Sequence, residues 1–155
     1  MRKTQARLFV VAAILMLAPS ASQAHVSIWP RESMVGATEK YTVRVPTEGK
    51  VATTSAELEV PDGVIVEVLA MPNTWKQEIK RKDGRIVAIT WQLTVPPGEF
   101  AEFSFVARNP RGESKQIVWT LRQKFADGAV TDWTHTPEGV LRPTAVTKLM
   151  PRPAQ

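Results

Sequence analysis

The chain has 155 residues, a formal net charge of +5 and no cysteine. The missing cysteine excludes disulfide bonds, thiolate metal sites and blue-copper sites, because the last of these need a Cys sulfur. Basic residues are interleaved with acidic ones along the chain, so the charge gives little support to nucleic-acid binding, and we predict no nucleic-acid partner.

The first 24 residues have the pattern of a secretory signal peptide. Three basic residues precede an unbroken apolar run from Leu8 to Ala18, and Ser22-Gln23-Ala24 supplies the small residues that signal peptidase requires. The apolar run is too short for a permanent membrane anchor. We therefore expect cleavage between Ala24 and His25 and a periplasmic or secreted protein. Its 131 residues would carry 17 basic and 15 acidic side chains, because the 24-residue signal removes three of the 20 basic residues.

The rest of the chain alternates with the two-residue period of β-strands. Val26 and Ile28 begin a short apolar strand, and further strands are expected at residues 41–45, 54–60, 64–69, 76–82, 85–95, 101–107, 116–125 and 129–134. The pairs Asp83-Gly84 and Asp127-Gly128 indicate hairpin turns, because these residue types tolerate a positive φ. No convincing amphipathic helix is present. The pattern predicts an all-β fold, an antiparallel β-sandwich of the immunoglobulin or cupredoxin type.

The end of the chain is rich in proline from Pro137 onward. Proline cannot donate to a sheet ladder, and chain ends are often irregular. We therefore assign residues 25–142 to the sandwich and residues 143–155 to an irregular C-terminal tail.

Cleavage after Ala24 would make His25 the first residue of the mature protein. Its α-amine and one imidazole nitrogen could then bind a metal ion together, since both groups lose protons near neutral pH. Cu(II) prefers tetragonal nitrogen and oxygen donors and stands at the top of the divalent affinity order. The alternative is a frayed terminus without a function. The strand predicted at Val26 and Ile28 favours a terminus that is held against the domain.

Several strings of the chain resemble the YcnI-like copper-binding proteins. The matching strings are residues 24–28 (AHVSI), 41–46 (YTVRVP), 52–58 (ATTSAEL), 103–110 (FSFVARNP) and 132–134 (DWT). The resemblance implies one Cu(II) ion held by the first mature histidine through its amine and ring nitrogen, a site called a mono-histidine brace. A Glu and a Trp complete that site, and by their places in the strings the three residues are His25, Glu57 and Trp133. The implied role is copper buffering, storage or delivery without catalysis, with another copper-handling protein as a further partner.

The residues themselves leave alternatives open. Glu57 also fits a solvated strand face, and Trp133 also fits the core. His135, two residues after Trp133, fits an exposed loop histidine, a local partner of a metal-binding residue or an additional copper ligand. A second histidine ligand would allow an oxidative enzyme, but the small domain lacks long substrate-binding loops, and we predict no enzyme. The alternative function is a metal-free sandwich module that recognises a protein or ligand, with the charged segment 76–85 as its surface.

Overall fold

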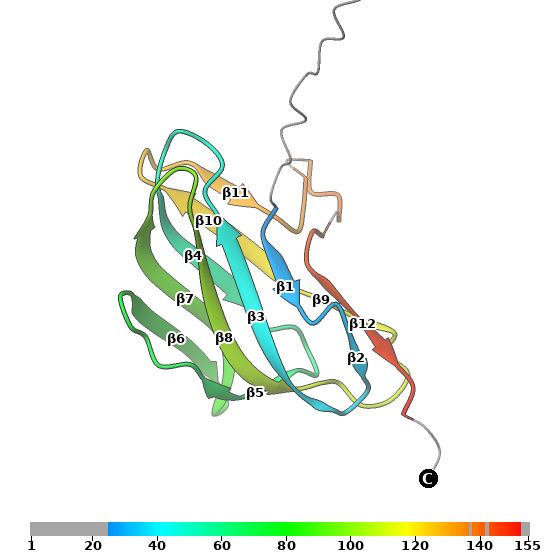
Figure 1. The fold of residues 1–155 in the computed structure, drawn as a ribbon. Helices are drawn as coiled ribbons and strands as arrows, with labels where there is room; N and C mark the ends of the chain where they lie inside the picture. The colour runs from blue at the N-terminus through cyan, green and yellow to red at the C-terminus, as the bar shows by residue number, and fades with distance from the viewer. Residues whose placement is uncertain (1–24, 137, 142, 153–155) are drawn as a thin grey trace, which may run out of the picture.

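The computed structural model describes residues 25–136, 138–141 and 143–152, which form an all-β structure (Figure 1). The predicted signal peptide, residues 1–24, lies outside the described residues. Within the described ranges, the structure contains no helix with the length and hydropathy needed to cross a membrane.

Two main sheets pack face to face. The four-stranded sheet has the order β1 (Ser27–Trp29), β3 (Thr38–Pro46), β8 (Phe100–Arg108) and β5 (Ile65–Leu69). The five-stranded sheet has the order β11 (Val130–Asp132), β10 (Thr120–Phe125), β4 (Thr53–Glu59), β7 (Arg85–Val95) and β6 (Lys76–Lys82). Every strand pair within these two sheets is antiparallel. The predicted antiparallel sandwich is confirmed.

A small third sheet corrects the prediction for the end of the chain. It has the order β2 (Glu32–Met34), β12 (Val146–Met150) and β9 (Gln116–Val118), and β12 runs parallel to β2. The prediction of an irregular tail over residues 143–155 is therefore wrong at β12. Thr147 and Leu149 of this strand are buried. Pro143 and Pro151 flank the strand rather than interrupt it, so proline marks its ends.

Aromatic residues fill the space between the sheets. Trp91, Trp119 and Tyr41 are almost completely buried, and the ring of Trp91 stacks on Phe103 with a centroid separation of 4.4 Å. The removal of such large apolar surfaces from water is the main favourable contribution to folding. The Tyr41 hydroxyl donates a hydrogen bond to Asn109 Oδ1 at 2.5 Å. Burial, assisted by the nearby charge of Glu39, raises the pKa of Tyr41 to about 12.

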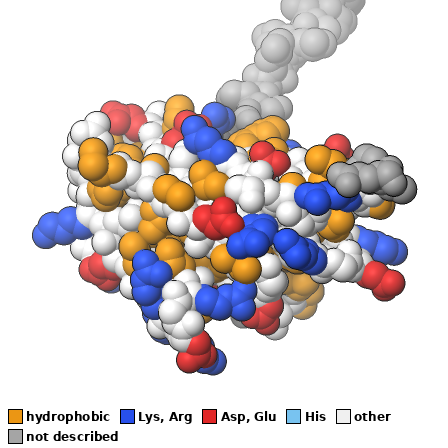
Figure 2. All heavy atoms as spheres, turned by 90° about the horizontal axis from the view of Figure 1, so that it is seen from below, with side chains coloured by type: hydrophobic (Ala, Val, Ile, Leu, Met, Phe, Trp, Pro, Cys, Tyr) orange, Lys and Arg blue, Asp and Glu red, His pale blue; other side chains and the backbone are white. Residues whose placement is uncertain are grey.

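The turns and surface agree with the sequence pattern. Asp83 and Gly84 have φ values of 50° and 77°, as the hairpin prediction requires. On the face seen from below in Figure 2, basic side chains lie among acidic and apolar ones. The strand predicted at 116–125 is divided at Trp119, whose backbone N–H donates to Ala145 O. As a result, β9 joins the third sheet and β10 joins the five-stranded sheet.

Candidate metal centre

The structure brings His25 and Trp133 together at one end of the sandwich. Ser27 pairs with Arg44, so two further residues in the same antiparallel register set His25 beside Pro46, the last residue of β3. Trp133 follows β11, and its backbone N–H donates to Leu121 O at 2.9 Å. The rings of His25 and Trp133 have a centroid separation of 5.3 Å and an interplanar angle of 46°. Figure 1 shows β1, β11 and the β3–β4 loop converging at this end.

Thr144 links the chain segments that carry the two rings. Its N–H donates to Trp133 O at 3.0 Å, and its hydroxyl donates to Val26 O at 2.8 Å. The Val26 side chain is buried in the core. The residue that follows His25 is therefore held by both packing and hydrogen bonding, and the strand predicted at the start of the mature chain is confirmed.

The structure does not bring Glu57 to this pair of rings. The neighbours of Glu57 on β4, Ala56 and Leu58, are buried between the sheets, so the two-residue period of the strand directs Glu57 to the outer face. There its Oε1 accepts a hydrogen bond from Arg122 Nη1 at 3.0 Å. Trp133 instead packs against the core. The two side chains lie on opposite faces of the five-stranded sheet.

Arg122 organises an ion-pair network on that outer face. It binds Glu57 and Glu59 through Nη1, and its Nε lies 3.7 Å from Asp132 Oδ2. Burial acts to raise the pKa of Asp132, but hydrogen bonds from the N–H groups of Thr134 and His135 outweigh it and hold that pKa below its usual range.

His135 is part of the same network. Its Nδ1 lies 3.4 Å from Asp132 Oδ2, and its backbone forms a bridge with Leu141. The contact with Asp132, which is not one of the predicted metal-binding residues, does not decide among the three interpretations of His135. Its Asp132 contact belongs to the outer-face network, whereas the ring beside Trp133 is that of His25.

Glu48 is an acidic residue near Trp133 that the sequence analysis missed. It lies in the β3–β4 loop and lines a cavity of about 270 Å³ together with Pro46, Gln123 and Trp133. Asp127 also lines this cavity, but its Oδ1 already accepts the N–H of Ala129 at 3.0 Å. The sequence signal for Glu48 is its position two residues beyond Pro46, at the end of β3, and this signal has meaning only once the β1–β3 register is known.

The donor groups at this end fit a copper ion. Among the described residues, no three His, Asp or Glu side chains come together as a metal-binding group. An ion there must therefore use fewer side chains and a further donor, and the α-amine of a processed His25 would supply one. Two nitrogens and a carboxylate oxygen suit Cu(II). The face of the Trp133 indole can also attract a cation.

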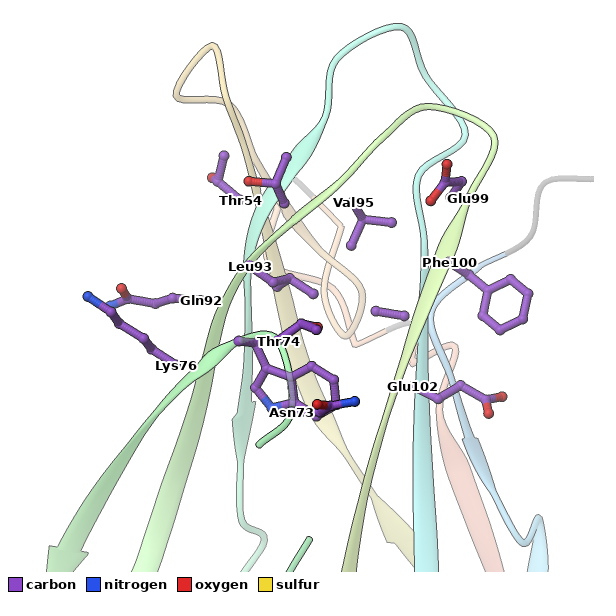
Figure 3. A pocket seen from close by; sticks show the side chains of 13 residues that line it. Thr54, Asn73, Thr74, Lys76, Gln92, Leu93, Val95, Glu99, Phe100 and Glu102 are labelled. Atoms are coloured by element: carbon purple, nitrogen blue, oxygen red, sulfur yellow. The ribbon is translucent and has the colours of Figure 1, made fainter. Parts of the chain in front are cut away.

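A wider cavity of about 940 Å³ opens between the ends of β7 and β8, with Leu93, Val95 and Phe100 among its lining residues (Figure 3). None of its lining residues is a histidine. Its lining Glu102 is paired with Arg44 at 2.9 Å. This cavity therefore offers no imidazole donor to a copper ion.

Comparison with known proteins agrees with the fold and with the family resemblance. Copper-binding protein CutI of Bacillus subtilis (strain 168) is 34% identical over 128 residues, which are 81% of this chain and 62% of that protein. The chain thus spans less than two thirds of that relative's length. An uncharacterised protein from Nocardia farcinica with an immunoglobulin-like fold has a TM-score of 0.66 at 25% identity, covering 81% of this chain and 97% of that one.

A more distant structure shares the fold alone. A cohesin module from a Clostridium perfringens family 33 glycoside hydrolase has a TM-score of 0.51 at 14% identity, covering 82% of this chain and 96% of that module. The family model described as "Domain of unknown function (DUF1775)" matches residues 25–154, which include all the described residues. The chain therefore belongs to the DUF1775 family, and its resemblance to the YcnI-like copper-binding proteins is confirmed.

Proposed function

We propose that this protein, once residues 1–24 are removed, binds one Cu(II) ion at the end of the sandwich where His25 meets Trp133. The α-amine and an imidazole nitrogen of His25 bind the ion, and the Trp133 indole covers one side of it. The observation that carries the proposal is the 5.3 Å contact between the two rings. The similarity to a protein named as copper-binding supports the identity of the ion.

The chemistry of His25 explains why processing matters. The α-amine and the imidazole Nδ1 of one residue close a six-membered ring on a metal ion, whereas an amide nitrogen in a continuous chain is not a comparable donor. Both nitrogens must be deprotonated to bind copper, so protons compete with the ion for them. Copper affinity should therefore decrease as the pH is lowered.

We further propose that Glu48, rather than Glu57, supplies the carboxylate oxygen. Glu48 shares a cavity with Trp133, whereas Glu57 is on the opposite sheet face and is bound by Arg122. A metal ion at Glu57 would have to displace that arginine. The family string that identified Glu57 locates it on β4 but does not place it near the rings.

The proposed role is copper buffering, storage or delivery in the periplasm or outside the cell. A chelating amine and one carboxylate can hold an ion without any reacting group, so the role requires no catalysis. An exposed site at the end of the domain would let another copper-handling protein accept the ion by taking over its ligands one at a time.

Blocking the N-terminal amine tests the proposal. The mature protein that begins at His25 should bind one equivalent of Cu(II), as measured by competition with a calibrated chelator and by electron paramagnetic resonance. The same protein with its α-amine acetylated keeps the imidazole but loses the amine donor, and it should lose tight binding. A His25→Ala variant is the matched control for the ring. Equal affinity of the acetylated and native forms would refute the proposed brace.

A further inference from the structure

One buried amide connects the parts of this site from inside the sandwich. Gln123 of β10 is 1% exposed and faces the core. Its Oε1 accepts the indole N–H of Trp133 at 3.0 Å. Its Nε2 donates to Pro46 O at 2.8 Å and to Thr53 Oγ1 at 2.6 Å. Both N–H groups of the amide and its oxygen are thus engaged, as burial of a polar group requires.

These hydrogen bonds join the two main sheets. Pro46 ends β3 in the four-stranded sheet. Gln123 belongs to the five-stranded sheet, as does β11, which Trp133 directly follows. Because His25 lies beside Pro46 in the continued β1–β3 register, the amide connects the indole to the strand that runs alongside the histidine. The spacing between the two rings therefore depends on Gln123.

The same network reaches the loop that carries Glu48. Thr53 Oγ1, which accepts from Gln123, also lies 2.6 Å from Thr47 Oγ1, and both threonines are buried. Thr47 immediately precedes Glu48 and anchors the start of the β3–β4 loop. The Gln123 amide is thus linked by hydrogen bonds to groups next to all three residues of the proposed site.

The bond to Gln123 also limits which part of the indole is available to a cation. The indole Nε1 uses its hydrogen for Gln123, and its lone pair belongs to the aromatic π system, so this nitrogen is not a metal donor. The face of the indole ring is therefore the part that can interact with a metal ion. A cation is attracted by that surface when it lies within about 6 Å of the ring centroid. The 5.3 Å separation from the His25 ring is compatible with an ion between histidine and indole.

We propose that Gln123 is a positioning residue of the copper site, which fixes the Trp133 indole with its ring surface toward His25. This inference rests on the function proposed above. Residues that orient metal-binding groups from behind typically change metal affinity by about 10-fold to 100-fold when they are removed. We therefore expect the loss of the Gln123 amide to weaken Cu(II) binding about 10-fold.

The chain contains a matched control. Gln77 Oε1 accepts the indole N–H of Trp91 at 3.0 Å, so the same kind of hydrogen bond occurs between β6 and β7. The strand β6 is at the edge of the five-stranded sheet opposite to β11. A Gln77→Met substitution thus removes a glutamine–indole bond without touching the proposed site.

The experiment compares mature wild-type protein with Gln123→Met and Gln77→Met. In the metal-free proteins, ¹⁵N spectra resolve the indole N–H groups of the five tryptophans, and a Trp133→Phe variant assigns the signal of interest. Gln123→Met should shift the Trp133 signal and accelerate its hydrogen exchange. It should also lower the Cu(II) affinity about 10-fold and change the electron paramagnetic resonance spectrum of the bound Cu(II). Gln77→Met should move only the Trp91 signal and leave copper binding unchanged.

The outcomes separate the two proposals. If wild-type protein binds Cu(II) through its processed N-terminus but Gln123→Met has the wild-type affinity and copper spectrum, the positioning role is refuted while the proposed function stands. If the wild-type protein shows no such binding, the proposed function fails and the positioning role fails with it. Should Gln123→Met not fold, Gln123→Asn keeps an amide in the core but shortens its reach by one methylene, and the same two readouts apply.

Discussion

Neutralising Glu48 and Glu57 one at a time tests which carboxylate belongs to the copper site. Glu48 lines the cavity beside Trp133, and the described residues contribute no side-chain hydrogen bond or ion pair to it. Glu57 lies on the outer sheet face, where Arg122 binds it at 3.0 Å. Glu48→Gln and Glu57→Gln remove the same charge and nearly preserve shape, so each variant is the control for the other.

The expected magnitudes follow from these environments. A unit charge about 4 Å from another contributes about 1 kcal/mol in water and about 4 kcal/mol at the effective dielectric of a protein surface. Because Cu(II) carries two unit charges, loss of the Glu48 charge next to it should lower Cu(II) affinity by at least roughly 30-fold. Glu57→Gln should change the affinity by less than about 2-fold, since Arg122 already offsets that charge and salt screens what remains.

Stability provides the second half of the comparison. The Glu57 and Arg122 side chains are 39% and 37% exposed, and pairs of this kind contribute about 0–1 kcal/mol. Glu57→Gln should therefore lower the unfolding free energy by at most about 1 kcal/mol, whereas Glu48→Gln should leave it unchanged. Chelator competition measures the affinity, and urea unfolding of the metal-free protein measures the stability. A large loss of copper affinity in Glu57→Gln, with none in Glu48→Gln, would refute the assignment.

Three further predictions concern the parts of the fold that hold this site. Tyr41 is the only tyrosine, and its raised pKa means that the unfolded chain loses this proton from about pH 10, whereas the folded protein keeps it to about pH 12. Stability should therefore fall by about 1.4 kcal/mol per pH unit across that window, and Tyr41→Phe should remove this part of the slope in alkaline urea titrations. Thr144→Val should cost about 1 kcal/mol by removing the bond to Val26 O, and faster hydrogen exchange at the start of β1 would report the loosening. Deletion of residues 146–155 removes buried Leu149 and the Thr147 acceptor of the Trp119 indole. It should cost about 3–6 kcal/mol from lost burial and an unsatisfied donor, and an unchanged melting temperature would contradict the role of β12.

The strands of the sandwich were predictable because their burial is local. Tyr41, Val43 and Val45 alternate with polar residues and are all buried, so the sequence pattern reports the inner face of β3 directly. The strand β12 was missed because nearby prolines obscured a short alternation in which Leu149 is the only buried large apolar side chain. Its place is determined by pairing with β2 and β9, which are distant in sequence.

The site was predictable only in part for the same physical reason. The prediction of His25 follows from the signal-peptide pattern and needs no tertiary structure. Trp133 reaches it because Arg122 pairs with Asp132, and this register puts the next residue on the inner face. Glu57 alternates with buried Ala56 and Leu58, so the strand pattern already assigned it to the opposite face from the core. The family resemblance selected Glu57 by its place in the sequence string. It did not indicate on which face of the sheet Trp133 meets His25.

The two faces of the β4–β10–β11 region differ in what a metal ion would have to displace. On the outer face, the carboxylates of Glu57 and Glu59 already accept hydrogen bonds from Arg122, so an ion must compete with a guanidinium that is always charged. At the inner end, the polar atoms of Gln123 are all engaged with groups that support the site rather than with its proposed donors. An ion that binds beside Trp133 can leave those hydrogen bonds intact. Such an ion would also not have to displace the Arg122 guanidinium, and this difference sets the inner end apart from the outer face.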